Sequence, residues 1–209
     1  MIPGTLPALP PALDLAGIAV FALSGALVAA RHGQTFVTMA FFALVTGVGG
    51  GSVRDLLIDA PVFWVSDRWV APLCLTVALA VWFTPTRLWE GRLLEWADAL
   101  GLAMFATIGT AKALAYGLPP IPAVLMGVIT GCVGGIIRDV LAGQPSILMR
   151  PELYVTAAAL SSVLCAVGLM FGIERLPVLA VASAAGFALR GAAIHWGLAI
   201  PSYARADQG

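Results

Sequence analysis

One short motif, a cluster of glycines followed by an arginine and an aspartate, occurs twice in the chain. The first copy is TGVGGGSVRD at residues 46–55, and the second is TGCVGGIIRD at residues 130–139. Each copy lies inside a long apolar run. At membrane depth an ionisable side chain indicates a functional site, and non-helical backbone must be satisfied by protein or water. The doubled motif therefore restricts the possible folds more than any other feature.

The two motifs belong to a longer internal repeat. An ungapped offset of 84 positions, from Asp14 to Asp98, superimposes residues 14–61 on residues 98–145. Glycine, arginine, aspartate and proline coincide at many of these positions, whereas membrane composition alone would match leucine and alanine. Each copy holds three apolar segments, an odd number, so the second copy is expected to cross the membrane in the opposite direction.

The composition assigns the chain to the membrane. Of its 209 residues, 60% are hydrophobic and 11% are charged, whereas soluble domains are about 45 to 50% apolar. The formal net charge is zero, and no basic block or acidic tail is present. We therefore expect contact with membrane lipids and no nucleic-acid partner.

Seven apolar segments are candidates for membrane-spanning helices, each of which needs about 20 residues. We expect an all-α integral membrane protein with a single membrane domain. Repeat 1 covers about residues 13–84, repeat 2 covers about 97–172, and an extra helix covers about 176–200. The seven expected helices are residues 13–30, 36–57, 69–83, 98–116, 122–141, 153–171 and 176–200.

The loop arginines predict the orientation in the membrane. With the N-terminus outside, five loop arginines lie on the inner side and two on the outer side. Cytoplasmic loops are enriched in basic residues, so we expect the N-terminus outside and the C-terminus in the cytoplasm, in the cell (inner) membrane of a bacterium. The inner set is Arg31, Arg87, Arg92, Arg150 and Arg205, and the outer set is Arg68 and Arg175.

The glycine clusters allow two interpretations. Each glycine costs about 1 kcal/mol of helix stability relative to alanine, so a cluster favours a kinked or unwound segment whose free carbonyls coordinate a partly dehydrated cation. Glycines four residues apart also let two helices approach closely, which is a purely structural role. Two kinked segments related by the repeat would meet near the middle of the membrane. The candidate path residues are Thr46, Gly49, Gly50, Gly51, Arg54, Asp55, Thr130, Gly134, Gly135, Arg138 and Asp139.

Each arginine of the motif follows the last glycine by three to four residues, which is one turn along the same helix face. Each aspartate is turned by about 100° from its arginine and is expected to reach another element. Either these residues form structural ion pairs, or the arginines line a water-filled path and the aspartates hold them in place. An unpaired charge would cost at least about 2.5 to 3.5 kcal/mol, so both interpretations require pairing or hydration.

Lys112 aligns with Val28 and therefore breaks the symmetry of the repeat. It either extends past Tyr116 toward the membrane interface or is a voltage-sensitive charge, for which the membrane field contributes about 2.3 kcal/mol per 100 mV. Enzymatic chemistry finds no support, because no nucleophile and base, phosphate loop or metal-ligand spacing is present. We expect no catalytic residue, no cofactor and no resident metal.

The seven spans, the three-plus-three repeat and the doubled motif resemble the prokaryotic branch of the trimeric intracellular cation (TRIC) channel family. The resemblance covers nearly the whole chain, from about Asp14 to about Ile200. It implies a homotrimer with one pore per protomer, lined by glycine-kinked second and fifth helices. It also implies that potassium and sodium pass as counter-ions, and it makes Lys112 the candidate voltage-sensitive charge. Val133 aligns with Gly49, so the two kinks are expected to differ in sharpness.

Three functions are compatible with these features. We favour a channel for monovalent cations. A secondary transporter of a small solute, such as an amino acid, uses inverted repeats and broken helices equally well. A non-conducting scaffold held together by glycine-rich helix faces is the third. An arginine-lined path conducts cations poorly, so the channel requires that the aspartates neutralise the arginines or that the arginines move aside.

Overall fold

The computed structural model describes residues 11–85, 92–149 and 153–200, and the main elements within these ranges are helices joined by turns and loops. The predicted all-α fold is confirmed. The elements are α1 (Pro11–Arg31), α2 (Phe36–Leu57), α3 (Val70–Phe83), α4 (Leu93–Ala115), α5 (Pro120–Leu141), the short 3₁₀ helix η2 (Ile147–Met149), α6 (Val155–Met170) and α7 (Arg175–Trp196).

Most helix ends lie close to the predicted ones, and two differ for identifiable reasons. Helix α4 begins at Leu93 instead of residue 98, because Leu93 and Leu94 pack against the apolar core and extend the helix. Helix α7 ends at Trp196 instead of residue 200. Gly197 adopts a φ of 66°, and its N–H donates to the Ala193 carbonyl, which is the usual geometry after the last turn of a helix.

Five of the described helices are long and apolar enough to cross a membrane, namely α1, α2, α4, α5 and α7. Helices α3 and α6 have 14 and 16 residues, so they rise only about 21 and 24 Å. A hydrocarbon core is about 30 Å thick. The prediction of seven apolar helices therefore holds, and α3 and α6 are too short to span the full core on their own.

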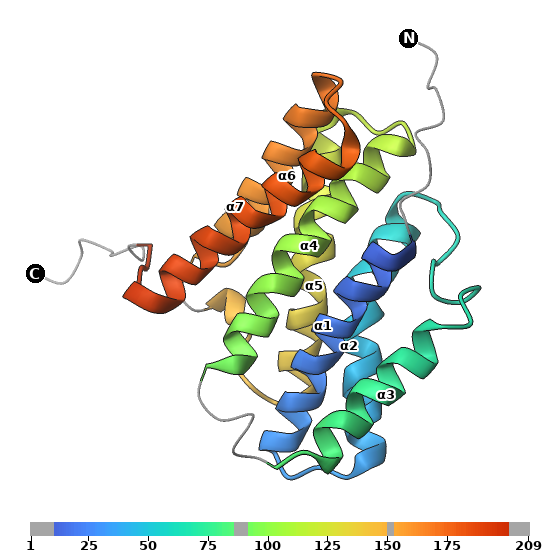
Figure 1. Ribbon diagram of the computed structural model, residues 1–209, viewed down its shortest axis with the longest axis vertical. Helices are drawn as coiled ribbons and strands as arrows, with labels where there is room; N and C mark the ends of the chain where they lie inside the picture. Colours follow the sequence, from blue (N-terminus) through green and yellow to red (C-terminus); the bar gives the residue numbers. More distant parts are fainter. Residues whose placement is uncertain (1–10, 86–91, 150–152, 201–209) are drawn as a thin grey trace, which may run out of the picture.

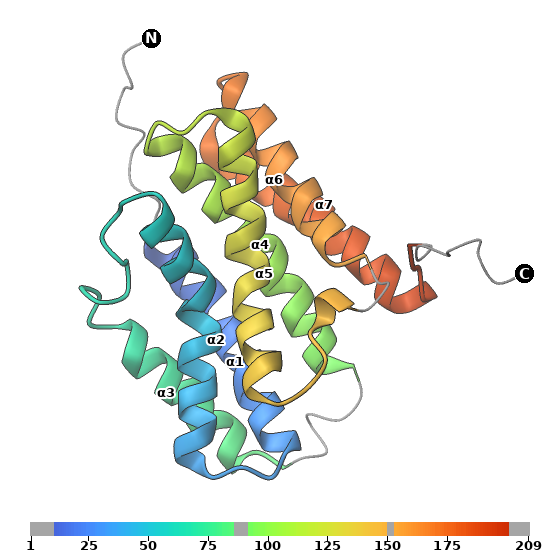
Figure 2. The same ribbon diagram turned by 180° about the vertical axis from the view of Figure 1, so that it is seen from behind.

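The helices form two bundles, α1 to α3 and α4 to α6, that lie side by side, and α7 packs against α4 and α6 (Figures 1 and 2). In Figure 1, helices α1, α3, α5 and α7 run downward, whereas α2, α4 and α6 run upward. Each helix of the first bundle is therefore antiparallel to its equivalent in the second. Helices α2 and α5 lie next to each other where the two bundles meet.

Equivalent positions of the two repeats contact one another reciprocally. The rings of Phe21 and Phe105 stack with their centroids 5.3 Å apart and their planes at 11°. Gly17 faces the Phe105 ring, and Gly101 faces the Phe21 ring. These four residues form two pairs that differ by the offset of 84. The sequence repeat is thus matched by a repeat of tertiary contacts.

Candidate functional site

The glycine clusters bring α2 and α5 together at a close crossing. Gly50 of α2 faces the Thr130 carbonyl of α5, and Gly134 of α5 faces the Thr46 carbonyl of α2. A Cβ atom on Gly134 would lie 2.6 Å from the Thr46 oxygen, and Gly49 lies beside the Gly134 Cα atom. All five residues are buried or nearly so. The crossing is tight because the two backbones touch without intervening side chains.

Both glycine clusters are helical throughout, since α2 and α5 continue without interruption across them. The expectation of an unwound segment with free carbonyls is therefore wrong. The packing of the two backbones offsets the low helix propensity of glycine, so tertiary contacts override a local preference. The threonines also behave as helix residues, because the Thr130 hydroxyl donates to the Met126 carbonyl at 2.6 Å.

A first charge cluster, Arg54, Asp55 and Lys112, lies at the C-terminal end of α2. Nε and Nη2 of Arg54 each lie 2.8 Å from Oδ1 of Asp55. Nζ of Lys112, from α4, lies 2.8 Å from the same oxygen. The Asp55 side chain is fully buried. One carboxylate of repeat 1 thus binds an arginine of its own helix and a lysine of the other repeat.

Phe63 completes the first charge cluster. Its backbone N–H donates to Oδ2 of Asp55 at 3.0 Å, and its ring lies 5.9 Å from the Arg54 guanidinium and 5.8 Å from Lys112 Nζ. Because both cations face the ring, cation–π attraction adds to the ion pairs. Only 20% of the Lys112 side chain is exposed. Lys112 therefore points into the protein, and its expected extension toward the interface is wrong.

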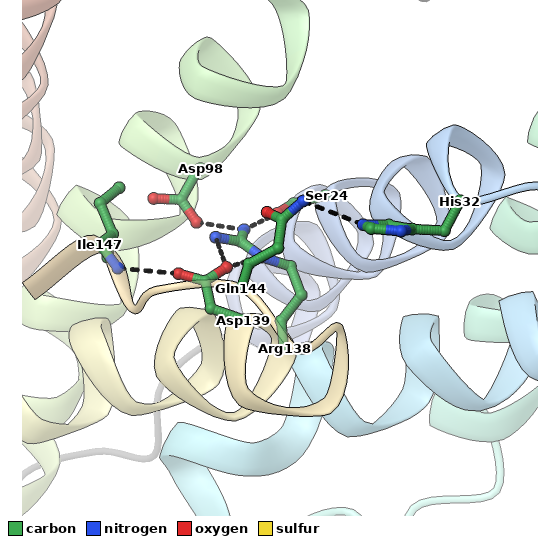
Figure 3. Close-up of polar contacts among 7 residues, drawn as sticks. All are labelled: Ser24, His32, Asp98, Arg138, Asp139, Gln144 and Ile147. Atoms are coloured by element: carbon green, nitrogen blue, oxygen red, sulfur yellow. Dashed lines mark hydrogen bonds and ion pairs between the residues drawn. The ribbon is translucent and has the colours of Figure 1, made fainter.

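A second charge cluster, Ser24, Asp98, Arg138 and Asp139, lies at the C-terminal end of α5 (Figure 3). Nε and Nη2 of Arg138 donate to Oδ1 of Asp139 at 2.9 and 2.8 Å. Nη1 of Arg138 lies 2.6 Å from Oδ1 of Asp98 and also donates to the Ser24 hydroxyl. Since Ser24 belongs to α1, this arginine joins the two repeats.

The loop after α5 closes over this cluster. The backbone N–H of Ile147 donates to Oδ2 of Asp139 at 2.9 Å, which repeats the contact of Phe63 with Asp55 at the offset of 84. The Gln144 side chain lies 2.9 Å from the His32 ring (Figure 3). Arg138 and Asp98 are 3% and 1% exposed. The second cluster is thus buried beneath a loop that is tied to the turn after α1.

The predicted path residues divide into three groups. The first group lies at the crossing and consists of Thr46, Gly49, Gly50, Thr130 and Gly134. The second group is the arginines and aspartates, which lie about one turn beyond the crossing at the C-terminal ends of α2 and α5. Because these helices are antiparallel (Figure 1), the two charged pairs lie on opposite sides of the crossing. The third group is Gly51, which faces the Phe63 ring, and Gly135, which faces the Tyr154 hydroxyl. The glycine segments meet as expected, but the two charged pairs are held apart on either side of them.

Two features of the clusters differ from the sequence-based expectations. The aspartates reach other elements as expected, Asp55 through Lys112 of α4 and Asp139 through the N–H of Ile147 in η2, but each also binds the arginine next to it through Oδ1. A long arginine side chain can fold back onto its neighbour, so the rotation of 100° per residue did not decide the pairing. The roles of Ser24, Asp98 and Phe63 were also missed. The alignment of Asp98 with Asp14 was the one available signal for an additional carboxylate.

We expect Ser24→Ala to weaken the second charge cluster modestly. Arg138 loses an acceptor but keeps Asp98 and Asp139, so the loss is about 1 kcal/mol, or about 2 to 4 °C in Tm. Thermal unfolding of the detergent-solubilised protein measures this loss. Ser66→Ala, in an exposed loop, is the control. Equal Tm values for the two variants would show that the contact between Arg138 and Ser24 does not stabilise the fold.

The overall fold that holds this crossing and the two charge clusters superimposes on known structures. A TRIC trimeric intracellular cation channel orthologue from Rhodobacter sphaeroides superimposes with a TM-score of 0.83 at 39% identity, over 90% of this chain and 98% of that one. The chain belongs to the TRIC channel family. A second TRIC cation channel structure matches with a TM-score of 0.84 at 26% identity, over 96% of this chain and 100% of that one.

Sequence relatives of this TRIC-family chain are membrane proteins. The sequence profile of a family described as glycine transporter matches twice, over residues 11–86 and 95–170. The UPF0126 inner membrane protein YadS of Escherichia coli is 38% identical over 205 residues, covering 94% of this chain and 97% of that protein. A UPF0126 membrane protein of Vibrio cholerae is 39% identical over 197 residues, covering 92% and 82%. The chain is thus an integral membrane protein.

Proposed function

We propose that the chain forms a homotrimeric channel for the monovalent cations potassium and sodium, with one pore per protomer along α2 and α5. The observation that carries this proposal is the likeness to the Rhodobacter sphaeroides cation channel, which extends over nearly both full chains. The proposed path passes the glycine crossing and the two charge clusters. It is lined by Thr46, Gly49, Gly50, Gly51, Arg54, Asp55, Thr130, Gly134, Gly135, Arg138 and Asp139.

The two repeats of the proposed channel are inverted in the membrane, with repeat 1 over about residues 13–84 and repeat 2 over about 97–172. The antiparallel directions of equivalent helices and the reciprocal contacts of Phe21 and Phe105 support this arrangement. We place the N-terminus outside and the C-terminus in the cytoplasm. Arg31 ends α1 and Arg92 precedes α4 at the same end of the molecule. Arg87, Arg150 and Arg205 of the loop count lie outside the described residues.

The pairing of the charges supports cation passage in spite of the arginines. The two charge clusters together contain three basic and three acidic side chains joined by ion pairs. Each arginine is therefore bound to a carboxylate. The first cluster carries one net positive charge because Lys112 shares Asp55 with Arg54, and the second carries one net negative charge, so the two sum to zero. Lys112 is the proposed voltage-sensitive charge, because its ion pair with Asp55 joins α4 of one repeat to α2 of the other. Movement of Lys112 away from Asp55 would loosen the crossing at that end.

Single-channel recording in a planar bilayer under a potassium chloride gradient tests the proposal. We expect resolvable unitary currents that reverse near the potassium equilibrium potential. Lys112→Met should raise the open probability and flatten its voltage dependence, because it removes a charge that ties α4 to α2. Lys112→Arg keeps the charge and serves as the control. Currents that reverse near the chloride potential would contradict the proposed selectivity.

A secondary transporter of a small solute is the alternative, because the matching family is described as glycine transporter, whereas the solved structures that the chain resembles are cation channels. Proteoliposomes that contain the same preparation distinguish the two functions. Saturable uptake of labelled glycine, without unitary currents at any voltage, would replace the channel by the transporter. Currents without saturable uptake would support the channel.

A further inference from the structure

The two charge clusters occupy equivalent places in the repeats but are not equally paired. In the second cluster, Arg138 binds two carboxylates, Asp139 beside it and Asp98 on α4. In the first cluster, Asp55 is the one carboxylate among the described residues that forms an ion pair with Arg54. The residue of α1 that aligns with Asp98 is Asp14. Across the described residues, neither an ion pair nor a hydrogen bond joins Asp14 to another group.

Nη1 of Arg54 is available to donate to such a partner. In the second cluster, Nη1 of Arg138 holds Asp98 and Ser24. Arg54 binds Asp55 through Nε and Nη2, and within the described residues its Nη1 makes no hydrogen bond. Asp14 is partly buried in the first turn of α1, the helix that packs against both α2 of Arg54 and α4 of Lys112, and the charges of Arg54 and Lys112 act on its carboxyl group. The first cluster therefore contains a carboxylate equivalent to Asp98 and a donor equivalent to Nη1 of Arg138, but these two groups do not bind each other.

Lys112 is the group that distinguishes the first cluster from the second. It stands where repeat 1 has Val28, and its ammonium group occupies the same Oδ1 oxygen of Asp55 that receives Arg54. Arg54 binds Oδ1 of Asp55 through the same two nitrogens that Arg138 uses on Asp139. The clusters differ in the added ammonium group of Lys112, a second cation on the shared oxygen that repels the Arg54 guanidinium. The second cluster has no lysine at the equivalent position, and its arginine binds both carboxylates. The second cluster therefore shows an arginine bound to two carboxylates, which the first cluster lacks while Lys112 binds Asp55.

We propose that Asp14 is a positioning residue of the channel, a latent second partner that receives Arg54 when Lys112 leaves Asp55. In that state the first cluster acquires the geometry observed for Arg138 between Asp98 and Asp139. The two states of the first cluster then differ by an exchange of ion-pair partners, and Arg54 stays bound to Asp55 in both. This inference rests on the proposed channel function only for its electrical readout.

A double-mutant cycle in thermal stability tests the exchange. Asp14→Asn is measured in the parent and in the Lys112→Met background, where Arg54 is free to close on Asp14. We expect the fall in Tm to be about 2 to 4 °C larger in the Lys112→Met background. If Asp14 merely attracts Lys112 at a distance, the sign reverses, and Asp14→Asn costs more in the parent. A reversed or zero difference therefore overturns the proposal.

Two controls separate Asp14 from its other neighbours. Arg175 of α7 also interacts electrostatically with Asp14, so the cycle is repeated in the Arg175→Gln background, where the same sign is expected. Loss of the difference there would assign Asp14 to Arg175 and overturn the proposal. Glu95→Gln, on the first turn of α4, should be additive with Lys112→Met. Lys112→Gln replaces Lys112→Met if the latter does not yield folded protein.

The electrical measurement distinguishes failure of this inference from failure of the channel. In bilayers, Asp14→Asn should shift the open probability curve toward larger voltages, because the state without the Lys112 ion pair loses its second carboxylate. Unshifted curves in a conducting protein would overturn the role of Asp14 and leave the channel intact. The expected sign of the stability cycle in a protein that passes no current would retain the exchange of partners and reject the channel.

Discussion

Replacing Arg138 with methionine is expected to destabilise the protein by about 3 to 5 kcal/mol, because the change leaves two carboxylates buried without their cation. Asp98 and Asp139 both bind Arg138 and are 1% and 6% exposed. Methionine preserves most of the packing volume, so the loss of stability measures the effect of removing the positive charge. The expected fall in Tm is at least about 6 °C, measured by thermal unfolding in detergent.

The chain supplies a matched control for this prediction. Arg54→Met removes the equivalent arginine of repeat 1, yet Asp55 keeps Lys112 at 2.8 Å and the Phe63 N–H at 3.0 Å. Its carboxylate therefore stays paired, and we expect less than half of the loss seen for Arg138→Met. Equal losses would indicate that the arginines stabilise the two sites through packing and not through charge compensation.

The outline of the fold could be predicted because its determinants are local. Apolar length and the glycines and prolines between the runs place the helices, and α2 has the predicted bounds at both ends. The offset of 84 residues also transfers tertiary detail. The Phe63 and Ile147 N–H groups bind Asp55 and Asp139 in the same way, so equivalent sequence gave equivalent capping of the two carboxylates.

The partners of the charges could not be predicted, because they depend on packing between the repeats. Lys112 meets Asp55 only because α4 passes the end of α2, and sequence separation gives no measure of that distance. The state of the glycine clusters was also undecided. About 1 kcal/mol per glycine is comparable to the packing energy gained when two backbones touch, so the helix can remain intact or unwind according to its neighbours.

Gly50→Ala is expected to destabilise the protein by about 3 kcal/mol, because the new methyl group has no space at the crossing. It would overlap the Thr130 carbonyl oxygen of α5, and backbone cannot rotate aside as a side chain can. Gly134→Ala meets the Thr46 carbonyl in the equivalent way, with 2.6 Å between the Cβ and oxygen atoms. Both variants should lower Tm by about 6 to 12 °C.

Gly49→Ala is the control that separates close packing from backbone flexibility. Its methyl group would meet first the Cδ1 atom of Ile137, at 2.9 Å, which is the mobile end of a side chain. Alanine also adds about 1 kcal/mol of helix propensity, so Gly49→Ala should be neutral or stabilising. If the glycines act by packing, only Gly50→Ala loses both Tm and conductance. If they act by bending the helix during conduction, both alanine variants reduce the current, and Gly49→Ala does so without a fall in Tm.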